Sequence, residues 1–419
     1  MGITTEAFTQ LASGRKLYVL STNLEGVGYV KLFKQMGLTV GGFIDSREYK
    51  DNRKCGVPII PPDEFFGSHS QDAVVVIAAK HRQTRKWAIE RCKDAGLQRG
   101  ESFFVSSDLC DCYPTIEIAG KCNLRCITCN LAVPEVYESG GFMSAADYRA
   151  VLTKMKKEVP FFSSVYLYAW GEPLLNKEIA EIIGITSELG IACEISTNLV
   201  VSPRLVERAI KANPDFLVVP CSGTEERFEI ARTGGKWNVF KENLYHLRKY
   251  LDEYKAETMV RIHYHMYNNN MEEDFDIVSG LCKELGFQFL PILAQIFPEY
   301  VLRNVLYKEP IPEPMQKANS LLYFPMEDQL AYAKANKHKF CFMIKIFPVV
   351  RWDRSVVHCS NLSFPTLSRD YLHTSLSDLL VIREQNQFCS KCQEHGMHRF
   401  FDVAATLKTV DGKRIIERG

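Results

Sequence analysis

Six strand patterns alternate with helix patterns between residues 114 and 297, and this alternation constrains the fold more than any other feature. Each apolar stretch is short enough for a strand, and each stretch between them has the spacing of an amphipathic helix. Such alternation predicts a parallel sheet covered by helices, as a partial or complete barrel, with functional side chains at the carboxyl ends of the strands. The predicted strands are residues 115–120, 164–170, 192–197, 215–220, 258–265 and 287–294.

A smaller α/β pattern precedes this region, and an irregular region follows it. Because 419 residues are too many for one ordinary core, we expect two or three domains. The N-terminal pattern predicts strands at residues 16–22, 39–46 and 72–79 and helices at residues 27–37 and 81–97. After residue 297 the alternation stops at a proline-rich stretch. The predicted domains are residues 1–110, 111–297 and 336–419, with a linker or surface excursion at residues 298–335.

The composition excludes several classes of partner. The chain is 46% hydrophobic and 24% charged, with a formal net charge of +1, so neither nucleic acid nor an anionic membrane is an expected partner. It has no run of about 18 apolar residues, and its first residues lack the layout of a secretion signal. We therefore expect a cytoplasmic protein, in a compartment where thiols stay reduced.

The fourteen cysteines are informative for that reason, since clustered cysteines in a reducing compartment are more often metal ligands than disulfides. Cys122, Cys126 and Cys129 follow the first predicted strand with the spacing C-x3-C-x2-C. Three thiolates in one short loop suit an iron–sulfur cluster that keeps one iron open for a small ligand. The spacing alone also allows a zinc site with a fourth ligand from elsewhere.

The loop and the strand ends that follow it resemble the radical S-adenosylmethionine (SAM) superfamily. That family carries C-x3-C-x2-C after its first barrel strand. Further segments are similar to its SAM-contacting stretches: YAWGEPLL at the second strand, ISTNL at the third, and CSGTEERFEIARTGG at the fourth. Three positions depart from the usual pattern: Thr128 stands where many members have an aromatic residue, Trp170 replaces a glycine, and Ser222 replaces an aspartate.

The resemblance implies the cofactors and the residues that bind them. A SAM-binding 4Fe-4S cluster would be held by Cys122, Cys126 and Cys129, and a reducing partner such as flavodoxin or ferredoxin would supply the electron. SAM would be cleaved to a 5′-deoxyadenosyl radical that abstracts a substrate hydrogen, which makes the chain an oxidoreductase or epimerase type of enzyme. The implied SAM contacts are Gly171, Glu172, Pro173, Ser196, Thr197, Asn198, Ser222 and Arg232.

A second cysteine group lies near the C-terminus. Cys341 and Cys359 flank a predicted strand pair that turns at residues 352–354, and Cys389 and Cys392 form C-x2-C. Four thiolates can close a structural metal site completely, which suits zinc as well as a cluster. The region resembles the twitch and SPASM extensions of radical SAM enzymes, and this resemblance implies one auxiliary 4Fe-4S cluster. His398 lies where the longer SPASM motif carries its next cysteine.

The N-terminal domain resembles the small Rossmann-like domain of glycan-biosynthesis proteins. Asp45 ends its second predicted strand, whereas Gly26 and Gly28 do not follow the G-x-G-x-x-G register of a phosphate loop. The expected fold class is thus α/β, with a partial (β/α)6 radical SAM barrel between a Rossmann-like domain and a twitch/SPASM-like extension. By association, this domain favours a sugar or nucleotide-sugar substrate, in glycan or secondary-metabolite biosynthesis.

Two residues are candidates for catalysis at the mouth of the barrel. Cys221 follows the fourth predicted strand, and we hypothesise that it donates a hydrogen atom to a substrate radical. Arg261, His263 and His265 alternate along the fifth strand, so they should share the inner face, where His263 is a candidate acid or base. A buried cysteine and a packed histidine are the simpler interpretations of these positions.

Two alternative functions remain compatible with the sequence. One keeps radical SAM chemistry but acts on a peptide or protein side chain. The other is a zinc-stabilised binding protein without catalysis.

Overall fold

The computed structural model describes residues 3–47, 52–68, 72–110, 112–133, 140–341, 343, 347–359, 362–400, 405–410 and 413–418. The chain divides into two compact units. The first consists of residues 1–113, 149–165 and 182–194, and the second of residues 114–148, 166–181 and 195–419.

The N-terminal part of the first unit is built on a six-stranded sheet of order β3-β4-β2-β1-β5-β6. Neighbouring strands pair in parallel except at β3–β4, and every residue of β5 is buried because helices cover the sheet. The predicted strands and helices of this region are confirmed. The strands are β1 (Lys16–Leu20), β2 (Val40–Ile44), β3 (Arg53–Lys54), β4 (Val57–Ile60), β5 (Ala73–Ile77) and β6 (Phe103–Val105). The helices are α1 (Thr5–Ala12), α2 (Leu24–Gln35), α3 (Pro62–Ser68), α4 (Arg82–Asp94) and α5 (Ser106–Leu109).

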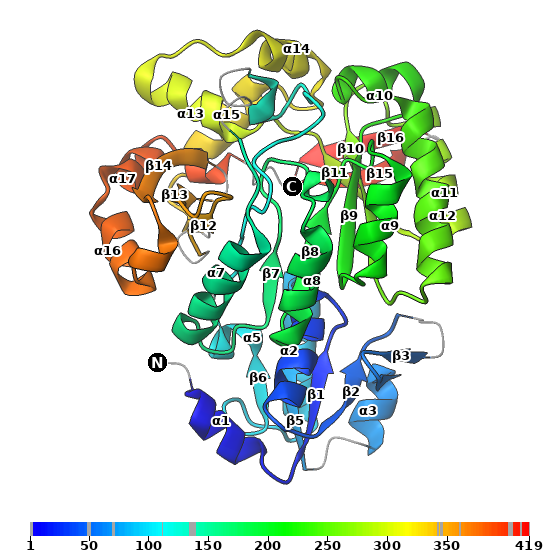
Figure 1. Cartoon of the computed structure of the whole chain (residues 1–419), viewed down its shortest axis with the longest axis vertical. Helices are drawn as coiled ribbons and strands as arrows, with labels where there is room; N and C mark the ends of the chain where they lie inside the picture. The colour runs from blue at the N-terminus through cyan, green and yellow to red at the C-terminus, as the bar shows by residue number, and fades with distance from the viewer. Residues whose placement is uncertain are drawn as a thin grey trace. The chain divides into compact units, whose positions relative to one another are not determined.

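A five-stranded sheet of order β11-β10-β9-β8-β7 follows the predicted alternation (Figure 1). Its strands are β7 (Ser164–Tyr166), β8 (Ala192–Ser196), β9 (Phe216–Cys221), β10 (Met259–Met266) and β11 (Gln288–Leu293). The helices are α7 (Ala145–Glu158), α8 (Ile179–Glu188), α9 (Pro203–Lys211), α10 (Glu225–Ala231), α11 (Trp237–Glu253) and α12 (Glu273–Leu285). The first predicted strand, residues 115–120, contributes only isolated bridges, with Thr115 parallel to Tyr166 and Ile116 parallel to Val350.

Strand β10 shows how the two faces of this sheet differ. Its residues alternate between partly buried and buried, and Tyr264 on the buried face contacts Phe275 of α12. Arg261, His263 and His265 therefore share the opposite face, as their spacing predicted.

Residues 298–335, which the sequence predicted as a linker or surface excursion, form three helices. They are α13 (Pro298–Tyr307), α14 (Glu313–Leu321) and α15 (Met326–Ala335). The prolines that suggested an irregular segment lie at helix starts, where a missing N–H costs nothing and the fixed φ angle is favourable. Their apolar faces join one core cluster that contains Val301, Leu302, Met315 and Ala318.

The C-terminal region has a three-stranded antiparallel sheet, of β12 (Val349–Val350), β13 (Val356–Cys359) and β14 (Leu362–Ser368), and two short helices. The helices are α16 (Leu376–Gln385) and α17 (Gln387–Glu394), and a hairpin of β15 (Ala405–Val410) and β16 (Lys413–Arg418) follows. The predicted turn at residues 352–354 joins β12 to β13.

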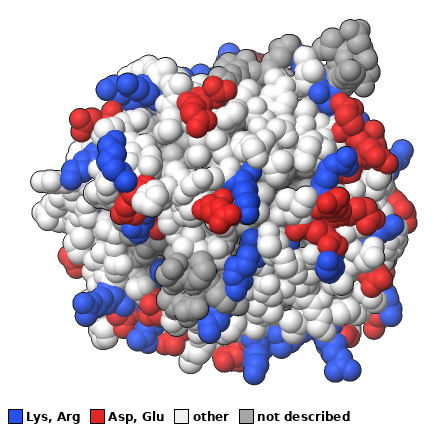
Figure 2. Space-filling view, turned by 90° about the horizontal axis from the view of Figure 1, so that it is seen from above, with Lys and Arg blue, Asp and Glu red and all other residues white. Residues whose placement is uncertain are grey.

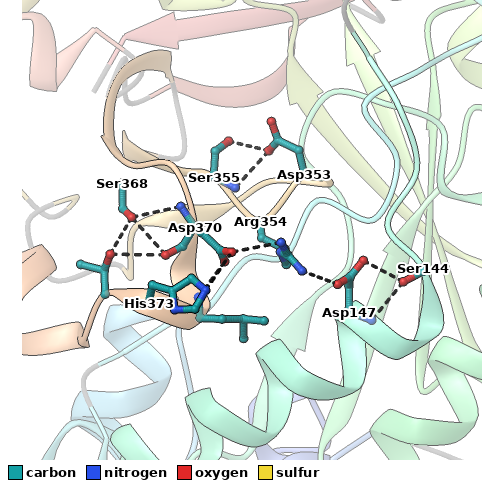
Figure 3. Close-up of polar contacts among 10 residues, drawn as sticks. Ser144, Asp147, Asp353, Arg354, Ser355, Ser368, Asp370 and His373 are labelled. Atoms are coloured by element: carbon teal, nitrogen blue, oxygen red, sulfur yellow. Dashed lines mark hydrogen bonds and ion pairs between the residues drawn. The ribbon is translucent and has the colours of Figure 1, made fainter.

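That turn is anchored by Arg354, whose guanidinium lies between two carboxylates (Figure 3). Its Nη1 contacts Asp147 Oδ1 at 2.6 Å, and its Nη2 contacts Asp370 Oδ2 at 3.0 Å. Asp147 also exchanges hydrogen bonds with Ser144 at the start of α7. One arginine thus connects the turn to a helix start and to the segment after β14.

Trp352 of the same turn packs against two glycines that flank the first cysteine loop. A Cβ atom on Gly120 would lie 2.2 Å from Trp352 Cδ1, and one on Gly141 would lie 2.3 Å from Trp352 Cζ3. Gly120 N also donates to Gly141 O at 2.8 Å. The Trp352 indole therefore packs over two backbone segments that are joined by a hydrogen bond.

Charge is distributed without a dominant sign on the face seen in Figure 2, where Lys and Arg are interspersed with Asp and Glu. Within the part of the chain that the structure describes, no helix is long and apolar enough to cross a bilayer.

Gly141→Ala should lower the free energy of unfolding by about 1–3 kcal/mol, because the new methyl group overlaps the Trp352 ring. Urea unfolding measures this change. Gly184→Ala is the matched control: this exposed glycine of α8 has no neighbouring atom within 4 Å, and alanine there should stabilise by about 0.5–1 kcal/mol. Equal effects of the two substitutions would contradict the packing role of Trp352.

Candidate functional site

A cavity of about 230 Å³ lies in the second unit, where the carboxyl ends of the strands meet. Tyr168 and Trp170 follow β7, Ser196 ends β8, His265 lies near the end of β10, and Phe297 follows β11. This is the edge at which parallel α/β folds place their functional residues. The remaining lining residues are Cys122, Leu124, Cys126, Thr128, Cys129, Leu131, Ala169, Gly171, Glu172, Asn198, Pro220, Arg232, Gln295.

The three cysteines of the first group line this cavity together. A turn brings two of them close, as Cys129 N donates to Cys126 O at 2.9 Å, and Leu124 N donates to Cys122 Sγ at 3.4 Å. Burial raises the pKa of the Cys122 and Cys129 thiols to about 12. The thiols therefore need a nearby cation or metal to become thiolates.

Arg232 supplies a buried cation beside these thiols. Its Nε donates to Ser222 Oγ at 3.0 Å, and its Nη1 contacts Cys126 Sγ at 3.6 Å. Its Nη2 is buried and has no hydrogen-bond partner within the described ranges. Three thiols, a cation and a free N–H donor in one cavity fit an anionic iron–sulfur cluster with a polar ligand beside it.

Gly171 and Glu172 connect the end of β7 to the cysteine loop. A Cβ on Gly171 would lie 1.8 Å from Ala119 O, so only glycine allows the strand end to pass this closely. The next amide, Glu172 N, donates to Lys121 O at 2.8 Å. The buried Glu172 carboxylate accepts from Leu174 N at 3.1 Å and Asn198 N at 2.7 Å, which ties β7 to the end of β8.

The third-strand segment surrounds the cysteine loop from the other side. Asn198 Nδ2 donates to Asn123 Oδ1 at 2.9 Å and lies 3.5 Å from Cys122 Sγ. Ser196 lines the cavity, whereas the buried Thr197 uses its Oγ1 to accept from Leu199 N at 3.1 Å. Pro173 is buried at the start of a short 3₁₀ helix (Pro173–Leu175) and is not among the lining residues.

The two catalytic candidates are not brought to the cavity wall. Cys221 is fully buried, its Sγ donates to Gly223 O at 3.4 Å, and burial raises its pKa to about 12. His263 shares the face of His265, but only His265 lines the cavity. Burial and the neighbouring Arg261 lower the pKa of His263 to about 4. The structure therefore favours the simpler interpretations, a packed cysteine and a neutral histidine.

Trp170 forms a wall of the cavity and is held there by residues that sequence reasoning missed. Glu117, which is fully buried, accepts from Trp170 N at 3.3 Å and pairs with Arg351 Nε at 3.2 Å. The Arg351 guanidinium lies 5.7 Å from the Trp170 ring centroid, and Phe297 packs edge-on against that ring. The sequence signal for this pair was the carboxylate of Glu117 inside the apolar stretch TIEIAG. Its partner, Arg351, is 234 residues away, so the pair could not be predicted from the local sequence.

The second cysteine group lines a separate space of about 50 Å³ in the C-terminal region. Cys341, Cys359, Cys389 and Cys392 all contribute, together with the buried His358 and Arg383. Burial raises the pKa of Cys389 and Cys392. Across the described residues, no three His, Cys, Asp or Glu side chains converge tightly enough to hold one metal ion.

Comparisons with known proteins agree with the cysteine motif at Cys122, Cys126 and Cys129. The family model described as the Radical SAM superfamily matches residues 116–277. The GTP 3′,8-cyclase of Clostridium acetobutylicum is 31% identical over 102 residues, which cover 24% of this chain and 31% of that protein.

Several solved structures are similar at low identity. Native anSMEcpe with bound AdoMet is 14% identical, with a TM-score of 0.45, and the match covers 69% of this chain and 97% of that one. BtrN in complex with AdoMet and 2-DOIA is 15% identical, with a TM-score of 0.40 and coverage of 69% and 89%. Streptococcus suis SuiB bound to precursor peptide SuiA is 14% identical, with a TM-score of 0.45 and coverage of 75% and 74%.

Residues 116–277 thus match the model of the radical SAM superfamily, and the expected fold class of a partial radical SAM barrel is confirmed. The superfamily implies SAM and a 4Fe-4S cluster as cofactors. The Rossmann-like assignment, the auxiliary cluster and the roles of individual site residues stay predictions.

Arg351→Met should lower the free energy of unfolding by about 3 kcal/mol, because it leaves the buried Glu117 carboxylate without its counter-charge. Adding Glu117→Gln should restore part of that loss, which a double-mutant cycle in urea unfolding measures. Arg248→Met is the control, since Arg248 pairs with Asp252 on an exposed helix face and should cost less than about 1 kcal/mol. Purely additive effects of Arg351→Met and Glu117→Gln on the free energy of unfolding would contradict an interaction between the two side chains.

Proposed function

We propose that this chain is a radical SAM enzyme that holds its SAM-binding 4Fe-4S cluster on Cys122, Cys126 and Cys129. The observation that carries the proposal is the single cavity lined by these thiols and by Gly171, Glu172, Ser196, Asn198 and Arg232, inside the domain that matches the superfamily model. When bound, the cluster and SAM supply one-electron cleavage of a sulfonium bond, which yields a 5′-deoxyadenosyl radical and methionine.

The chain's own residues bind, orient and shield these groups. Arg232 offsets the negative charge of the thiolates and keeps one N–H donor for the carboxylate of SAM. Asn198 Nδ2, which donates to Asn123, and Glu172 N, which donates to Lys121 O, fix the shape of the cysteine loop. Trp170 and Phe297 form an apolar side of the cavity, which excludes water from a radical reaction.

A second cluster in the C-terminal region is the other part of the proposal. Cys341, Cys359, Cys389 and Cys392 supply four thiolates, and the buried Arg383 provides a neighbouring cation. Such a closed set has no open position for a substrate, so its role is to stabilise the region and to exchange electrons. We infer an electron acceptor for a substrate radical, which favours net oxidation.

For the substrate we propose a sugar or nucleotide-linked sugar. Two observations support this choice: the N-terminal parallel α/β sheet, a common nucleotide-binding architecture, and the relative whose name indicates that it acts on GTP.

Iron content separates the two cysteine groups. Anaerobically reconstituted protein should contain about eight irons per chain. Cys122, Cys126 and Cys129 changed together to Ala should remove about four irons and abolish 5′-deoxyadenosine formation, whereas Cys389→Ala with Cys392→Ala should remove the other four and keep reductive SAM cleavage. Cys92→Ala, at a buried cysteine of α4, is the control. A colourless protein that binds zinc and no iron would overturn the enzyme proposal.

The substrate class is tested by 5′-deoxyadenosine release from the reduced enzyme. Nucleotide sugars should raise the rate above the level with SAM alone, and deuterium from the substrate should appear in 5′-deoxyadenosine. Stimulation by a peptide and by no sugar would replace this substrate proposal with peptide maturation.

A further inference from the structure

The side chain of His358 lies in direct contact with a cysteine of the second group. It lies on β13, one residue before Cys359, and its Nε2 is 2.9 Å from Cys389 Sγ on α17. The contact joins a strand and a helix that are 31 residues apart, so local chain geometry does not impose it.

The surroundings of His358 hold the ring in this orientation. The side chain is 2% exposed, and its ring packs edge-on against Phe388 at 5.4 Å between centroids. The other ring nitrogen, Nδ1, is buried without a hydrogen-bond partner inside the described ranges.

The ring nitrogen that donates follows from the contact between Nε2 and Cys389 Sγ. A metal-bound cysteine sulfur carries negative charge and only accepts hydrogen bonds, and Nδ1 has no acceptor to serve. The Nε2–H tautomer therefore satisfies both constraints when the site is loaded, with the N–H directed at Cys389 Sγ.

We propose that His358 donates a hydrogen bond to the cluster-bound thiolate of Cys389 and thereby raises the reduction potential of the auxiliary cluster. The inference rests on the proposed auxiliary cluster. Hydrogen bonds to the sulfurs are among the determinants of cluster potential, and a donor stabilises the reduced, more negative form. His358 is thus a positioning and tuning residue, and Cys389 remains the ligand.

His398 is a matched comparison within the same space. It also lines the cavity, but its Nε2 is 2.8 Å from the backbone oxygen Lys339 O and is committed there. Its removal changes the packing of the site without removing a donor to the Cys389 thiolate.

The experiment uses the full chain with Cys122, Cys126 and Cys129 changed to Ala, so that the auxiliary cluster is the one that remains. After anaerobic reconstitution, iron content and an EPR-monitored redox titration are compared for this parent and for His358→Leu, His358→Gln and His398→Leu. His358→Leu should keep about four irons and have a lower midpoint potential, while His358→Gln, which retains an N–H donor, should fall between it and the parent. His398→Leu should leave the potential unchanged.

Each other outcome has a distinct meaning. Equal midpoint potentials in the parent and both His358 variants would contradict the proposed hydrogen bond from His358 to Cys389. The proposal of an auxiliary cluster would still stand. Loss of iron or altered EPR g-values in His358→Gln, with a native far-UV spectrum, would make His358 a ligand and overturn its role as a donor. A parent that takes up no iron would overturn the auxiliary cluster itself.

Discussion

The buried pair of Glu117 and Arg351 connects three parts of the second unit that are distant in sequence. Glu117 lies just before the first cysteine loop, Arg351 belongs to the C-terminal sheet, and the Trp170 backbone between them forms the cavity wall. A carboxylate without exposure is tolerated only with a counter-charge and hydrogen bonds, and Glu117 has both. Because the pair joins residues from the first and last thirds of the chain, the C-terminal region helps to hold Trp170 in the cavity wall.

The same docking is supported by packing on either side of the pair. Trp352 covers Gly120 and Gly141, and Val349 and Val357 share an apolar cluster with Trp170 and Leu131. Cys122 and Cys129 pack against this cluster, while Cys359, two residues beyond Val357, lines the second cysteine cavity. One short strand, β13, thus contacts the surroundings of both cysteine groups.

Both cysteine groups have the same electrostatic surroundings. Thiols of each group are buried, which raises their pKa, and each group has a buried arginine beside it, as the proposed clusters require. Arg232 reaches Cys126 directly, and Arg383 lines the second space. Anionic clusters need such compensation because a low dielectric penalises isolated charge.

The alternation of strands and helices, the strand ends that carry GEP and STN, and the two cysteine groups were predictable from the sequence, because hydrophobic period and cysteine spacing are local patterns. The helices of residues 298–335 were not predicted, since prolines mark helix starts as well as loops. The sequence also offered Cys221 and His263 as catalytic, whereas Cys221 is fully buried and His263, on the same face as His265, is not among the lining residues of the cavity. The contact partners of Glu117, Trp170 and His358 are visible only in the tertiary structure. Each contact joins residues far apart in the chain, and a pairing of that kind leaves no periodic trace in a single sequence.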